Sequence, residues 1–186
     1  MSRIELSPPL SDQMLEQLRI GDDVRISGVI YTGRDAAHKR LVETLDRGEP
    51  LPVNLAGQII YFVGPTPPKP GEPIGSAGPT TSYRMDAYSP RLMAEAGLKA
   101  MIGKGGRAPE VIDAMVRHKC VYLAAVGGAG ALLGRLVTAA RVVAYEDLGP
   151  EAIRELTVRD FPAVVVNDTT GADLYKQGFK PWRTSG

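Results

Sequence analysis

The sequence predicts an α/β fold, a single domain with a mostly parallel sheet and crossover helices. Between residues 89 and 166, short apolar runs rich in β-branched residues alternate with segments of helical periodicity. This alternation is typical of parallel strands, because each parallel connection needs a crossover of a dozen or more residues. The 186 residues, 44% of them hydrophobic and 23% charged, suit one compact globular domain. Before residue 89 strand patterns predominate, which predicts an additional β layer.

The first half is predicted to contain two strands and one helix. Residues 24–31 (VRISGVIY) alternate in polarity, and residues 58–63 (QIIYFV) form a second apolar run. Between them, Thr32 with Asp35 three residues later resembles a capping box, which predicts a helix. Residues 64–78 are rich in proline and glycine and are predicted to be a loop.

The second half is predicted to alternate regularly between helix and strand. Proline near a helix start and glycine after its end mark several boundaries, as at Pro90 and Gly97. In order, we expect helix 89–97, strand 98–102, helix 108–119, strand 120–126, helix 129–137, strand 141–145, helix 149–156 and strand 163–166.

Charge and composition exclude several classes of partner. The formal net charge is +1 and no basic patch stands out, so no nucleic-acid partner is expected. No apolar run approaches 18 residues and the N-terminus lacks the apolar core of a signal peptide, so we expect a cytoplasmic protein with no membrane association. Cys120 is the single cysteine and is predicted to be a buried structural thiol. With only two histidines besides, no metal site is predicted within this chain.

Glycine, hydroxyl and basic side chains occur together in three segments that follow or adjoin predicted strands. These are residues 31–35 (YTGRD), 78–86 (GPTTSYRMD) and 102–106 (IGKGG). In open α/β sheets, ligands bind at the carboxyl ends of the strands. If the three segments meet there, they form one pocket with these residues: Arg34, Arg84, Lys104, Thr80, Thr81, Ser82, Gly105 and Gly106.

Such a pocket suits a small polyanion. Arginine binds a carboxylate through two parallel hydrogen bonds, and lysine adds a compact charge. Gly105 allows the backbone to approach a ligand closely. The alternative is that Arg34 and Arg84 are surface ion-pair partners of Asp35 and Asp86, and that the hydroxyl residues serve a turn.

Three other features have competing interpretations. Residues 126–134 (VGGAGALLG) are rich in glycine like a dinucleotide-binding turn, with Glu146 further on, but the spacing departs from that motif. The glycines could instead permit close helix packing. His38 is interpreted as a hydrogen-bonded supporting residue rather than a proton carrier, and Trp182 has no predicted role.

The three segments, in this order, resemble the β-type catalytic domain of class I fumarases and L-tartrate dehydratases. Residues 31–40 are similar to that family's TxRDxxHxR segment, residues 78–85 to its GPTTxxRM signature, and residues 103–106 to its GKGG loop. Further similarity extends the match to roughly residues 20–175. Tyr83 departs from the pattern, since relatives commonly carry a smaller residue there.

The resemblance implies a swivelling β/β/α-type fold for one catalytic domain, residues 1–186 with a core of about 20–175. It implies that Arg34, Thr80, Arg84, Lys104 and Gly105 bind substrate, and that Thr80, Thr81 and Lys104 are catalytic, with Thr80 transferring the proton.

The resemblance also implies a partner, because the family's [4Fe–4S] cluster needs three cysteines that this chain lacks. An α subunit would carry them, in an α2β2 hetero-oligomer active only when both subunits are present. The implied reaction is the reversible hydration of fumarate to L-malate. The alternatives are the β subunit of L(+)-tartrate dehydratase, which converts tartrate to oxaloacetate, or a non-catalytic module that binds a dicarboxylate or a nucleotide.

Overall fold

The structure, a computed structural model of the chain, describes residues 3–126 and 128–180, so Trp182 lies outside the described residues. The strands are β1 (Ile4–Leu6), β2 (Asp23–Thr32), β3 (Ile59–Tyr61), β4 (Ala100–Gly103), β5 (Val121–Ala124), β6 (Val137–Ala144) and β7 (Ile153–Asn167). The α-helices are α1 (Asp12–Leu15), α2 (Asp35–Asp46), α3 (Ser89–Ala96), α4 (Pro109–His118), α5 (Gly130–Arg135) and α6 (Leu174–Gln177). Two 3₁₀ helices complete the set, η1 (Ser82–Met85) and η2 (Glu146–Glu151).

The sheet closes on itself through its last strand. Its order is β1-β2-β3-β4-β5-β7-β6, and β7 also pairs with β2. Strands β2, β3, β4 and β5 are parallel neighbours, whereas β7 runs antiparallel to β2, β5 and β6. Because β7 bonds to both β2 and β5, the five strands β2, β3, β4, β5 and β7 form a ring. The mixed α/β fold is therefore confirmed, with a sheet less parallel than predicted.

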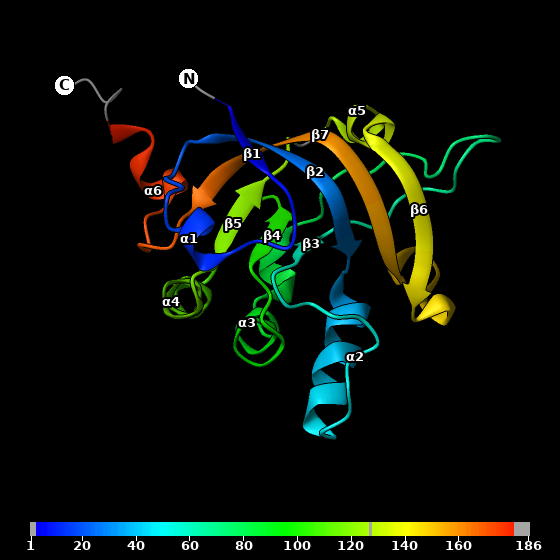
Figure 1. Ribbon diagram of the computed structural model, residues 1–186, viewed down its shortest axis with the longest axis horizontal. Helices are drawn as coiled ribbons and strands as arrows, with labels where there is room; N and C mark the ends of the chain where they lie inside the picture. The colour runs from blue at the N-terminus through cyan, green and yellow to red at the C-terminus, as the bar shows by residue number, and fades with distance from the viewer. Residues whose placement is uncertain (1–2, 127, 181–186) are drawn as a thin grey trace.

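Two apolar clusters lie on the two faces of this ring. Successive side chains of a strand point to opposite faces. Ile59 and Tyr61 accordingly belong to the cluster enclosed by the strands, and Ile60 and Phe62 to the one facing the helices. Helices α2, α3 and α4 cover that second face, and Figure 1 shows all three on the same side of the sheet. This layer determines where the loops that follow β2, β3 and β4 emerge.

Most predicted helices and strands are confirmed, with shifts of a few residues at their ends. Helix α3 carries proline in its first turn and is followed by Gly97 in the left-handed region, at φ 69°. Helix α4 likewise begins at Pro109. The loop prediction for residues 64–78 is also confirmed.

Two local predictions were wrong. Thr32 does not cap α2: Arg34 occupies the N-cap position, and the Thr32 hydroxyl donates to the Ala152 carbonyl and accepts from the Arg154 amide. The predicted helix 149–156 is absent from the described residues, since η2 ends at Glu151 and β7 begins at Ile153. Pairing of β7 with β2 and β6 overrides the helical start that Pro150 indicates.

No helix among the described residues is both long and apolar enough to cross a bilayer.

Candidate functional site

The three predicted segments come together at one edge of the sheet. The first follows β2 and the third follows β4, and these strands flank β3 in parallel register. The second reaches the same edge because the Thr80 amide donates to the Phe62 carbonyl, just past β3, at 2.7 Å. Parallel neighbouring strands end on the same side, so the fold itself brings the loops into contact.

The segment around Thr80 (the threonine loop, residues 79–86) pairs directly with the segment around Lys104 (the lysine loop, residues 103–107). The Lys104 amide donates to the Thr80 carbonyl at 3.3 Å, and the Ser82 amide donates to the Lys104 carbonyl at 3.0 Å. Thr81 and Lys104 thus form a parallel bridge. Gly105, next in the chain, adopts φ 81°, a conformation that favours glycine. The structure therefore brings Thr80, Thr81, Lys104 and Gly105 together, as predicted.

The two arginines, Arg84 within the threonine loop and Arg34 in the first segment, both contact acidic side chains. The Arg34 Nη2 atom is 3.4 Å from Glu151 Oε1, and its Nε is 3.9 Å from Asp35 Oδ2. Arg84 Nε is 2.8 Å from Asp35 Oδ1. The ion-pair alternative is thus partly correct, but the acid at Arg84 is Asp35 rather than Asp86. The pairs of Arg34 are half-buried and Arg84 is exposed. Ion pairs that stay in contact with solvent contribute only about 0–1 kcal/mol, so a competing carboxylate can replace the acid.

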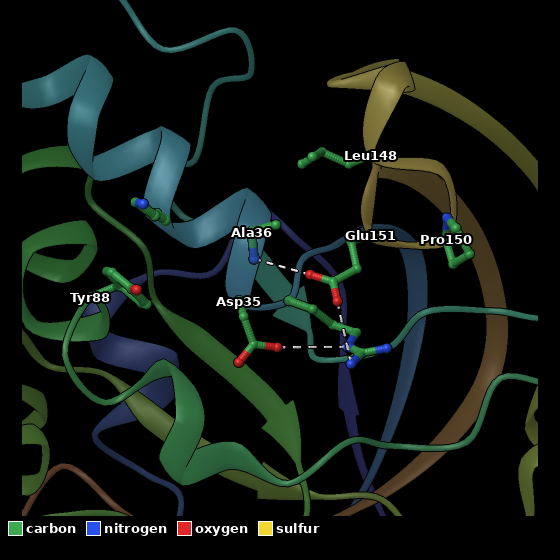
Figure 2. A pocket seen from close by; sticks show the side chains of 8 residues that line it. Asp35, Ala36, Tyr88, Leu148, Pro150 and Glu151 are labelled. Carbon is green, nitrogen blue, oxygen red and sulfur yellow. Dashed lines mark hydrogen bonds and ion pairs between the residues drawn. The ribbon is translucent and has the colours of Figure 1, made fainter.

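A cavity of about 600 Å³ opens next to Arg34. Figure 2 shows Tyr88 and Asp35 on one side of it and Leu148, Pro150 and Glu151 on the other. Thr80, Lys104 and Arg84 do not line this cavity. Gly64, shortly after β3, has no side chain, and this allows Arg34 to pack closely against the backbone. A Cβ at Gly64 would lie 3.0 Å from Arg34 Nη1. Arg34 and Asp35 line the cavity, and Asp35 also contacts Arg84 of the threonine loop.

A comparison with known protein families identifies the family to which this chain belongs. The family model described as "Fumarase C-terminus" matches residues 1–178. The chain belongs to this family.

Curated relatives are similar over nearly the whole chain. The aerobic class I fumarate hydratase of Salmonella typhimurium is 39% identical over 178 residues, which is 94% of this chain and 31% of that protein. The anaerobic class I enzyme of Escherichia coli is 37% identical, covering 94% and 32%. A Methanocaldococcus jannaschii protein, provisionally named L(+)-tartrate dehydratase subunit beta, is 38% identical over 173 residues, covering 90% and 89%. The chain thus spans about a third of the length of the class I fumarases and most of the length of the Methanocaldococcus jannaschii protein. Both names denote hydro-lyases, and class I fumarases are iron–sulfur enzymes.

This Fumarase C-terminus domain carries a neutral histidine beneath Arg34. His38 Nδ1 lies 2.9 Å from the Arg34 carbonyl, which only accepts, so Nδ1 carries the proton. Complete burial lowers the pKa of His38 to about 4. Its ring packs edge-on against Phe62, 5.3 Å between centroids. His38 therefore supports the loop backbone from within the helical core and does not face the cavity.

Sequence reasoning missed a buried cation behind the site. The Arg107 side chain is fully buried, with Nε 2.6 Å from Asp86 Oδ1, and its guanidinium lies 5.2–5.3 Å from the ring centroids of Phe62 and Tyr122. The other Asp86 oxygen accepts from the Ala108 amide. Asp86 is therefore committed to Arg107, which explains why Arg84 pairs elsewhere. The only signal was position: Arg107 directly follows the GKGG run.

The glycine-rich segment has a packing explanation. A Cβ on Gly130 would lie 2.4 Å from Ser76 Oγ, and one on Gly134 would lie 2.3 Å from the Gly75 carbonyl oxygen. These glycines let α5 pack directly against residues 75–78. Helix α5 has only six residues.

The residues of this chain do not fit an iron–sulfur cluster. Such a cluster is held by several thiolates, and Cys120 is buried with Sγ donating to the Leu98 carbonyl. Burial raises the pKa of Cys120 to about 12, so it stays protonated. Among residues 3–126 and 128–180, no three His, Cys, Asp or Glu side chains group as a metal site.

Proposed function

We propose that this chain is the β subunit of a two-subunit iron–sulfur hydro-lyase that hydrates fumarate reversibly to L-malate. It contributes the cationic and hydroxyl groups of a shared active site. The observation that carries this proposal is the backbone pairing of the threonine loop with Lys104, which makes Thr80 and Thr81 neighbours of this exposed basic residue. Membership of the Fumarase C-terminus family supports the reaction class.

Carboxylate binding is assigned to Arg34, Arg84 and Lys104. Each guanidinium is already paired with a carboxylate. A substrate carboxylate would displace Glu151 from Arg34. Asp35 contacts only Nε of Arg84 and would keep orienting that guanidinium while its other N–H groups bind substrate. A charge-assisted, two-pronged contact is stronger than a neutral hydrogen bond and fixes the orientation of the ligand. Gly105 has no side chain, so a substrate carboxylate could approach its backbone closely. Three cations match the two negative charges of a dicarboxylate.

Proton transfer is assigned to the Thr80 hydroxyl, with Thr81 beside it. A hydroxyl is a weak base at neutral pH and needs a neighbour that stabilises its deprotonated form. The nearby Lys104 ammonium supplies such a charge. It would also stabilise the negative charge that develops on the carboxylate next to the carbon that loses its proton.

The [4Fe–4S] cluster is assigned to three cysteines of an α subunit, in an α2β2 assembly. The single thiol of this chain is buried and protonated, which is the reason for placing the cluster ligands on the partner.

The second candidate is the β subunit of L(+)-tartrate dehydratase, forming oxaloacetate from tartrate. It is favoured by one observation: a relative of which this chain covers 89% is provisionally named as that subunit. Tyr83 is an exposed residue of the threonine loop, where its ring would narrow access for one of the two acids.

The test is to assemble this chain with its α partner under anaerobic conditions and to assay fumarate hydration beside tartrate dehydration. Arg84→Ala should lower kcat/KM by about 30- to 150-fold, because a charge-assisted contact is worth roughly 2–3 kcal/mol. Arg47→Ala, which removes an exposed cation at the far end of α2, is the control. Full activity of this chain alone would contradict the two-subunit proposal, and exclusive activity on tartrate would select the second candidate.

A further inference from the structure

The threonine and lysine loops are joined a second time, below the surface, by side chains. Ser82 and Tyr122 are completely buried. The Ser82 Oγ atom lies 2.8 Å from the Tyr122 hydroxyl, and that hydroxyl lies 2.9 Å from the Gly105 carbonyl oxygen. Ser82 belongs to the threonine loop and Gly105 to the lysine loop, so Tyr122 of β5 connects the two.

The direction of both hydrogen bonds follows from the groups involved. A carbonyl oxygen only accepts, so the Tyr122 hydroxyl donates to Gly105. The tyrosine has one proton, and Ser82 must therefore donate to the tyrosine oxygen. Burial raises the pKa of Tyr122, which keeps this hydroxyl protonated at any working pH. We refer to the chain Ser82–Tyr122–Gly105 as the hydroxyl bridge.

The surrounding packing fixes the hydroxyl bridge in place. The Tyr122 ring packs 5.2 Å from the buried Arg107 guanidinium, which lies equally close to the Phe62 ring. The Phe62 carbonyl in turn binds the Thr80 amide. Gly103 is also required, because a Cβ there would lie 2.0 Å from Ser82 Oγ.

We propose that Ser82 and Tyr122 are positioning residues that set the placement of the Thr80 hydroxyl relative to Lys104 in the hydro-lyase reaction. This inference rests on the proposed function. The backbone bridge alone leaves the two loops free to rotate about their hydrogen bonds, whereas a rigid aromatic ring bonded to both restricts that motion. Arg34 lies on another segment, so its own carboxylate contact is independent of the hydroxyl bridge, whereas Arg84 and Lys104 belong to the two bridged loops. Proton transfer is sensitive to small displacements of the groups involved.

The variants are Tyr122→Phe, Ser82→Ala and the double variant, each assembled with the α partner. Each single change should lower kcat between about tenfold and a hundredfold, with a smaller proportional rise in KM, because Arg34 still holds one carboxylate. The double variant should lose no more than the worse single variant, because both changes break the same chain. Thr44→Val is the control: it also removes a buried hydroxyl-to-carbonyl hydrogen bond, of 2.8 Å, but in the last turn of α2.

Hydrogen exchange of the full chain gives a readout that does not depend on activity. In Tyr122→Phe, peptides covering residues 79–86 and 103–107 should exchange faster than in the wild type, because the pairing of the two loops opens more often. Thr44→Val should leave these peptides unchanged.

Unchanged exchange in Tyr122→Phe would overturn the hydroxyl bridge itself. Faster exchange with wild-type kcat would overturn its positioning role, as would a lower melting temperature without any kinetic change. A wild-type complex inactive on both fumarate and tartrate would refute the proposed function instead, and the exchange experiment would still decide whether the bridge restrains the loops.

Discussion

The Nε atom of Arg84 lies 2.8 Å from Oδ1 of Asp35, so a single contact ties the threonine loop to the start of α2. The second oxygen of the same carboxylate faces Arg34 Nε at 3.9 Å. Asp35 Oδ2 and Arg34 Nε are both buried, and neither has a hydrogen-bond partner within the described part of the chain. One acid therefore orients both arginines that are proposed to bind substrate.

Replacing this acid should damage catalysis more than stability. Asp35→Asn removes a half-exposed ion pair, which should cost about 0–1 kcal/mol of unfolding free energy. Arg84 loses its orienting charge, so kcat/KM should fall by about tenfold or more. Denaturant unfolding and steady-state kinetics on the same preparations measure the two effects. A variant that loses stability and activity in proportion would contradict this role.

Glu151 is expected to compete with substrate for Arg34. In Glu151→Gln the side chain can still accept from the Ala36 amide, as Oε2 does at 3.0 Å, but its charge no longer pairs with Arg34. KM should therefore fall by about two- to fivefold, the equivalent of an exposed ion pair. A raised KM would show that Glu151 mainly positions the arginine.

Two glycines of the lysine loop should respond differently to alanine. A Cβ on Gly103 would meet Ser82 Oγ at 2.0 Å and Phe62 Cδ2 at 2.9 Å, whereas one on Gly106 meets nothing within 4 Å. Gly103→Ala should lower the unfolding free energy by about 1–3 kcal/mol, the usual cost of overpacking. Gly106→Ala is the matched control and should unfold like the wild type. Equal stability of the two variants would contradict the close packing around Ser82.

Acid sensitivity should depend on His38. Its pKa is lowered to about 4 by burial, against 6.5 for the ordinary group, so between these values the unfolded chain binds a proton that the folded chain does not. This contribution to stability is complete above pH 6.5 and is lost as the pH falls towards 4, by ~3 kcal/mol. His38→Asn retains a donor for the Arg34 carbonyl but lacks that titration. Its unfolding free energy should fall less across this window, as urea titrations at several pH values would show.

Local patterns predicted the parts of the fold that depend on short-range rules. Strand β2 and helices α3 and α4 were recognisable because alternation, proline and glycine act within a few residues. Of strand β7, only residues 163–166 were recognisable, because Gly149 and Pro150 indicate a helix over residues 149–156. Its conformation depends on distant partners, such as the register of Leu156 against Ile30. Thr32 was misread for the same reason, since its hydroxyl bonds to residues 120 and 122 positions away.

The residues of the candidate site also fall into two groups, those that the sequence indicates and those that only the fold reveals. Thr80, Arg84 and Lys104 stood out because cations and hydroxyls beside glycines are unusual after apolar strands. Tyr122 was hidden within an apolar run, where nothing distinguishes a core tyrosine from one whose hydroxyl joins two loops. Arg107 reads as a surface cation until the fold encloses it.

The ring of strands has a consequence for how this protein folds. The loops of the candidate site follow β2, β3 and β4, but the ring that holds these strands closes only when β7 pairs with both β2 and β5. The β2–β7 pairing joins residues 23–31 to residues 155–164, and such contacts form slowly because a long intervening chain must first be ordered. The candidate site should therefore be completed late in folding, and changes within β7 that weaken its pairing with β2 should slow the appearance of the site.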